Sequence, residues 1–145
     1  MSGLFETAAG AFAVVGVVDV LVRTGRELHT FLRDVDDAPS SLAALRDNIG
    51  DVLVLANTCK GCLQRLVDNP QYASSAEVVD LFRKAVDNLC QEVKRLNTLT
   101  SRYKGKSRGW SNIKYVLDES RIAKAVNSVE RSKSLMSNTV ALANR

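Results

Sequence analysis

Three cysteines and a single histidine are the residues of this chain that could bind a metal or carry out redox chemistry. Cys59 and Cys62 form a Cys-x-x-Cys motif. In a redox enzyme such a motif follows a strand and opens a helix, but here it falls late in a predicted helix. A zinc site needs four ligands. Cys59, Cys62, Cys90 and His29 are four candidates, but only Cys59 and Cys62 have the spacing of zinc ligands. We therefore interpret the cysteines as small buried hydrophobic residues, and we expect no metal or cofactor.

A second candidate motif, Gly105-Lys106-Ser107, is similar to the end of a phosphate-binding loop. That loop needs a glycine five residues before Gly105, where Thr100 stands, and a preceding strand. A lone His29 without a Ser or Cys partner in a defined turn cannot form a catalytic triad either. The sequence therefore predicts a non-enzymatic protein.

Charge is distributed unevenly along the chain. Residues 1–38 carry three basic and six acidic side chains, whereas residues 104–145 carry nine basic and three acidic ones. Within the basic part, four side chains could contact anionic lipid headgroups: Arg102, Lys104, Lys106 and Arg108. Residues 102–114 could instead form a solvated turn or bind nucleic acid. Nucleic acid is not expected as a partner, because no nucleic-acid-binding fold is recognisable.

The elements that position these residues are predicted to be helices. Apolar residues recur every three or four positions in three segments, residues 40–68, 74–103 and 119–143. A basic turn is followed by three apolar residues that share one face of a short helix: Trp110, Ile113 and Leu117. A further helix at the N-terminus is expected to close at residues 34–39. The sequence predicts one all-α domain over residues 1–145, an antiparallel bundle of about four long helices and one short helix.

The N-terminal segment, residues 1–22, is unusual because it is apolar on every side. No charge occurs between Glu6 and Asp19. A membrane-spanning helix needs about 20 largely apolar residues, and a central Asp costs roughly 2.5–3.5 kcal/mol on insertion, so the segment is marginal as a monomeric span. It is also a poor signal peptide, because Glu6 stands where a basic residue is required.

Two interpretations of this helix stay open. In the first, it is a central helix of the bundle, surrounded by the others. In the second, it is buried at rest and can be released to a membrane, alone or as an oligomer. Four small residues would then allow close helix contact: Gly3, Gly10, Ala13 and Gly16.

Several segments resemble the N-terminal domains of fungal STAND (NLR-like) receptors, the HeLo, HeLo-like and SesA group. The resemblance begins with small and apolar residues up to Val22. It continues with Thr30-Phe31-Leu32-Arg33-Asp34-Val35-Asp36-Asp37-Ala38-Pro39 and Leu42-Ala43-Ala44-Leu45-Arg46-Asp47. It ends with Trp110-Ser111-Asn112-Ile113-Lys114-Tyr115-Val116-Leu117, Ile122, Val129 and Ser132-Lys133-Ser134-Leu135.

The resemblance implies an effector domain of regulated cell death, of the heterokaryon-incompatibility or immune type. It implies a partner sensor of NLR-like or amyloid-signalling type and self-association on activation. In this group a nucleotide-binding sensor or an amyloid-templating segment normally follows the domain. Because the sequence carries neither, the resemblance implies an isolated effector domain. The domain would be cytoplasmic and recruited to the plasma membrane, which agrees with the intracellular compartment that three unpaired cysteines indicate.

The leading hypothesis is an effector that oligomerises and permeabilises the membrane, with anionic lipids as partners. Its expected apolar membrane contacts are Leu4, Phe5, Phe12, Val14, Val15, Val17 and Val18, with Glu6 and Asp19 as polar positions. The alternative is a helical interaction or adaptor module of an NLR-like receptor that has no membrane activity. An exposed apolar patch on helices other than the first would favour this alternative.

Overall fold

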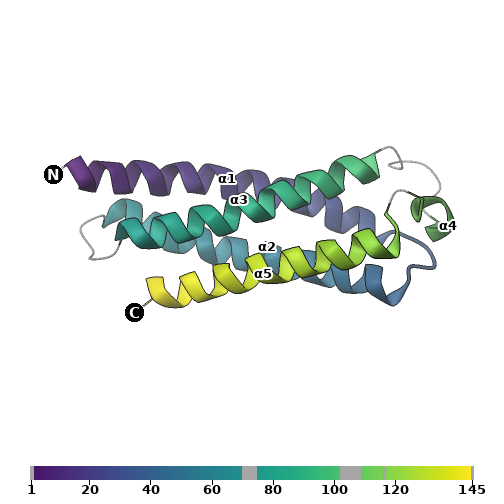
Figure 1. The fold of residues 1–145 in the computed structure, drawn as a ribbon. Helices are drawn as coiled ribbons and strands as arrows, with labels where there is room; N and C mark the ends of the chain where they lie inside the picture. The colour runs from purple at the N-terminus through teal and green to yellow at the C-terminus, as the bar shows by residue number, and fades with distance from the viewer. Residues whose placement is uncertain (1, 70–74, 102–108, 116, 145) are drawn as a thin grey trace.

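The computed structural model describes residues 2–69, 75–101, 109–115 and 117–144. They form four long helices and one helical turn: α1 (Ser2–Arg33), α2 (Ser40–Asp68), α3 (Ser75–Thr100), α4 (Trp110–Ile113) and α5 (Glu119–Ala143). Within these residues no strand is present. The all-helical bundle predicted from the periodicity is therefore observed (Figure 1).

The four long helices occupy the corners of a square in the order α1, α2, α5, α3. Helix α1 packs against α2 and α3, and α5 packs against the same two helices, whereas α2 and α3 barely touch. Each long helix runs opposite to the one before it in the chain, so the neighbours α1 and α3 are parallel to each other, as are α2 and α5 (Figure 1). The bundle is thus only partly antiparallel. The chain crosses the diagonal of the square between α2 and α3.

All four long helices bury one stripe of residues with alternating steps of three and four. In α2 the buried stripe is the predicted one: Leu42, Leu45, Ile49, Val52, Ala56, Cys59, Leu63 and Leu66. In α3 it includes Phe82, Val86, Leu89, Val93 and Leu96, and in α1 it includes Ala11, Val14, Val18, Leu21, Gly25, Leu28 and Leu32. This spacing of seven residues per two turns is typical of side chains that interlock in left-handed bundles.

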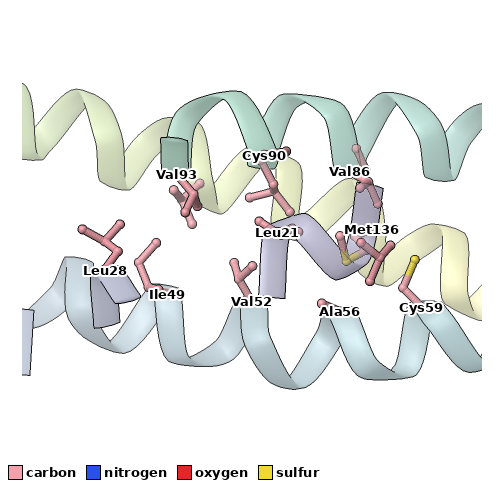
Figure 2. Packing of buried hydrophobic residues seen from close by; sticks show 14 of the residues in the cluster. Leu21, Leu28, Ile49, Val52, Ala56, Cys59, Val86, Cys90, Val93 and Met136 are labelled. Carbon is pink, nitrogen blue, oxygen red and sulfur yellow. The ribbon is translucent and has the colours of Figure 1, made fainter. Parts of the chain in front are cut away.

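The core consists of layers to which the helices contribute neighbouring side chains. Figure 2 shows Leu21 of α1 beside Val52 of α2 and Cys90 of α3, and Leu28 near Ile49 and Val93. Leu21, Leu28, Ile49, Val52 and Val93 are completely buried. The layers show that α1 is an integral part of the core.

The stripe of α5 is more polar than the others, because Ser132 and Thr139 take two of its buried positions. Next to this stripe, the Lys133 ammonium donates to Asn48 Oδ1 at 2.8 Å and to Asp51 Oδ2 at 3.2 Å, both on α2. The weaker apolar periodicity of α5 is therefore accompanied by polar contacts with its parallel neighbour.

The end of the bundle near α4 is closed by the connection between α1 and α2. The Trp110 N–H donates to the Asp36 carbonyl at 3.1 Å, and Asp37 has a φ of 57°, which Asp tolerates better than most residues. Ile113 and Leu117 are buried there. Helix α5 then begins at Asp118, whose Oδ1 accepts a hydrogen bond from the Arg121 N–H at 2.8 Å.

Two expectations about the helices need correction. The helix expected to include Trp110, Ile113 and Leu117 is a single turn that ends at Ile113. Both interpretations of the first helix expected it to be enclosed at rest, and this is wrong, because a corner helix has two neighbours and one side without any, on which Phe12 is 71% exposed.

Two phenylalanines of α1 provide a matched test of this placement. Phe31 is 4% exposed and Phe12 is 71% exposed. We expect Phe31→Ala to lower the free energy of unfolding by about 3–5 kcal/mol, because it leaves a cavity in the core, and Phe12→Ala to change it by less than about 0.5 kcal/mol. Urea unfolding followed by circular dichroism measures both values. Equal losses would contradict the assignment of the two faces.

Candidate functional site

The solvent-facing side of α1 is apolar along its first half and charged along its second half. Four exposed residues follow one another at helical spacing in the first half: Ala9, Phe12, Ala13 and Gly16. We call these four residues the α1 apolar face. From Asp19 onward the exposed positions include Arg23 and Arg26. The change from apolar to charged takes place within about one helical turn.

The α1 apolar face is exposed because the core stripe runs along the other side of the helix. Val15, Val17 and Val20 flank the stripe and are half-buried. The exposed share of Phe12 is 71%, an unusual value for a large apolar side chain in the middle of a helix. The structure therefore places a phenylalanine ring, with small residues around it, directly in solvent.

The two halves of α1 are also anchored to the bundle differently. Among the described side chains of the first half, residues 8–18, the buried ones are small, Ala11, Val14 and Val18, whereas those of the second half include Leu21 and Leu28. Burial stabilises by about 0.8 kcal/mol per CH₂ group, so each buried position of the first half contributes less to holding the helix in place.

Polar contacts reinforce the difference between the halves. The Lys60 ammonium of α2 donates to Asp19 Oδ1 at 2.9 Å, and the Asn97 amide of α3 donates to Glu27 Oε2 at 3.0 Å. Among the described side chains, none in residues 8–18 forms such a link to another helix. Residues 8–18 of α1 are thus held by apolar contacts with small side chains.

The structure divides the residues predicted to contact a membrane into three groups. Phe12 is exposed, Val15 and Val17 are half-buried, and Val14 and Val18 are core residues. Val14 and Val18 could therefore reach lipid only after α1 had left the bundle. The side chains of Leu4, Phe5 and Glu6 lie outside the described part of the structure. Asp19, predicted as a polar position, is the partner of Lys60.

The basic residues proposed for lipid contact, Arg102, Lys104, Lys106 and Arg108, fall in 102–108, outside the described residues. The Gly105-Lys106-Ser107 motif falls there too.

The cysteines are buried in the core, as the interpretation of them as small hydrophobic residues predicted. Burial, with a smaller contribution from Cys62, raises the pKa of the Cys59 thiol to about 12. Such a thiol stays protonated at neutral pH and is a poor nucleophile. His29 is half-buried against Gly50 of α2. Among the described residues, no group of His, Cys, Asp and Glu side chains could hold a metal ion.

Two features of the site were not predicted from the sequence. The α1 apolar face could not be told from the core side, because both are apolar. The approach of Lys60 to Asp19 joins residues 41 positions apart, which only the pairing of α1 with α2 brings together.

By length and composition, Ala8–Arg33 could cross a membrane, and 28% of its most apolar 18-residue stretch is buried. Core helices and signal sequences pass the same test, but a helix enclosed by neighbours would be mostly buried. No protein-family model, no curated protein and no solved structure matches this chain. The geometry of α1 and the resemblance to the HeLo, HeLo-like and SesA group therefore remain as the indications of function.

Proposed function

We propose that this chain is a non-enzymatic effector domain of regulated cell death that self-associates and acts on a membrane through α1. The observation that carries the proposal is the α1 apolar face, with Phe12 in solvent on a helix long enough to span a bilayer. The receptor-type sensor, the cytoplasmic resting state and the recruitment to the plasma membrane belong to the same proposal. They rest on the resemblance to the HeLo, HeLo-like and SesA group.

The first contact with a membrane would use the α1 apolar face while the bundle is intact. An aromatic side chain can enter the headgroup region at a small entropic cost and gains from the transfer out of water. Ala9, Ala13 and Gly16 leave room beside Phe12, so that the backbone of a second helix could approach closely. The same surface therefore suits lipid contact and helix pairing.

Deeper insertion would require the first half of α1 to separate from α2 and α3. The small core side chains of residues 8–18 keep that cost low, and residues 3–22 would extend over about 30 Å, the thickness of the hydrocarbon core. Asp19 would lose Lys60 in this step. In an oligomer its carboxylate could face a water-filled centre, where its charge is tolerated.

The second candidate function is a helical interaction or adaptor module without membrane activity. The exposure of Phe12 at rest also favours this reading, because an apolar surface that is present before activation can bind a protein partner. Among the described residues, the other exposed large hydrophobic side chains are those of Val54 on α2, Leu142 on α5 and Tyr115 between α4 and α5. The two candidates therefore share the α1 apolar face and differ in what covers it.

Phe12→Asp should abolish leakage of anionic vesicles by the forcibly clustered domain, because a carboxylate would prevent the face from entering lipid. Val54→Asp is the matched control, since Val54 is 70% exposed on α2. Dye release measures both variants, and circular dichroism checks that both are folded. If the unmodified domain neither binds nor permeabilises vesicles, the membrane function is wrong. If Phe12→Asp then blocks self-association or partner binding, the adaptor function is supported.

Two glycines test whether α1 associates through close helix contact. A methyl group at Gly16 or at Gly61 would have no atom within 4 Å, so alanine at either position should stabilise the folded monomer by roughly 0.5–1 kcal/mol. Only Gly16→Ala should weaken self-association on vesicles, measured by cross-linking, because Gly61 lies on α2. Unchanged association of Gly16→Ala would argue against contact through this face.

A further inference from the structure

A groove with a volume of about 480 Å³ lies between α1 and α2. It begins at Asp19, about one turn beyond Gly16, the last residue of the α1 apolar face. It is lined by Asp19, Val22, Arg23, Arg26, Asn57 and Lys60. The pairing of α1 with α2 creates it, since the two sides are more than 30 residues apart in the chain. Three of its side chains are cations and one is a carboxylate.

The charges of the groove are only partly compensated. Lys60 is paired with Asp19 at 2.9 Å. Among the described residues, no carboxylate forms an ion pair with Arg23 or Arg26, and both side chains are exposed. The Asn57 amide adds a neutral donor on the opposite wall. Two guanidinium groups, an ammonium and an amide around one small groove are the donors that bind a phosphate group.

A second polar groove, between α3 and α5, offers a comparison. It has a volume of about 360 Å³, and its lining includes Glu92 and Arg95. Arg95 Nη2 donates to Glu92 Oε1 at 2.7 Å, so this pair neutralises itself. Arg131 also lines the α3–α5 groove, so among the described residues that groove has one cation without a carboxylate partner, whereas the α1–α2 groove has two.

The position of the α1–α2 groove indicates the source of the phosphate. Arg23 lies one residue after Val22, where the apolar part of α1 ends, and about 16 Å along the helix axis from Phe12. While the bundle is intact, Arg23 and Arg26 lie on the same exposed side of α1 as the α1 apolar face, so contact of that face with a bilayer would bring the groove to the headgroup level. We propose that Arg23, Arg26 and Lys60 bind the phosphate of an anionic lipid headgroup in this groove. The choice of lipid rests on the proposed function, whereas the phosphate site rests on the groove alone.

Vesicle flotation tests the lipid assignment. The double variant Arg23→Gln/Arg26→Gln should lower binding to phosphatidylcholine vesicles that contain phosphatidic acid by about tenfold or more. The matched control is Lys124→Gln/Arg131→Gln, which removes the same charge from exposed positions of α5, diagonally opposite α1. This control should lower binding by less than about threefold. Equal losses for the two variants would mean unspecific attraction and would overturn the site.

Titration with glycerol 3-phosphate, followed by NMR, tests the phosphate site without a membrane. Amide shifts should be concentrated in residues 19–26 and 57–60 and should disappear in Arg23→Gln/Arg26→Gln. Asp19→Asn should raise the affinity about twofold or more, because it releases Lys60 for the ligand. Shifts elsewhere, or no effect of Asp19→Asn, would overturn the site.

The two experiments separate the failure of the site from the failure of the proposed function. Localised glycerol 3-phosphate binding in a domain that never permeabilises vesicles keeps the site and removes the effector role. Localised binding together with unchanged vesicle flotation of the double arginine variant overturns the lipid assignment and indicates a free phosphate. Leakage without localised phosphate binding removes the site and keeps the effector role.

Discussion

A helix at the corner of a four-helix bundle can bury only the side that faces its two neighbours. In this chain every long helix buries one stripe with alternating steps of three and four, and that stripe takes up a minority of each helix surface. The first half of α1 has more apolar residues than such a stripe can hold. The surplus, which includes Phe12, must therefore remain in solvent until a membrane or another protein covers it.

The same constraint explains how α1 is organised along its length. Beyond Asp19 the outward positions are charged, the core side chains are larger, and the links to Lys60 and Asn97 fix the helix to α2 and α3. The second half is thus a firm base from which the first half can separate. The boundary between the halves lies beside the α1–α2 groove, so that apolar and phosphate-binding surfaces would follow one another along a single helix.

Much of the fold could be predicted from the sequence, because three of the four long helices have one apolar stripe each. The segment predicted over 40–68 is α2, and that over 119–143 is α5. Apolar periodicity could not assign the buried side of α1. When every face is apolar, periodicity cannot indicate which side is buried, and the choice depends on neighbours that only the folded chain provides.

The candidate site was less predictable than the fold for a related reason. Phe12, Val14 and Val18 were grouped as membrane contacts, but Val14 and Val18 belong to the core, whereas Phe12 is exposed. Arg23 and Arg26 are ordinary surface residues in the sequence, and only the packing of α2 against α1 places Lys60 beside them. Sites made of side chains from two helices depend on the register of that packing, which local patterns do not contain.

Amide hydrogen exchange of the intact, soluble domain tests the central claim most directly. If residues 8–18 of α1 are held by their small side chains, their amides should exchange through local opening at least about tenfold faster than those of residues 21–32. The rest of the bundle should keep its protection. Equal protection of both halves, at the level of global unfolding, would contradict the account.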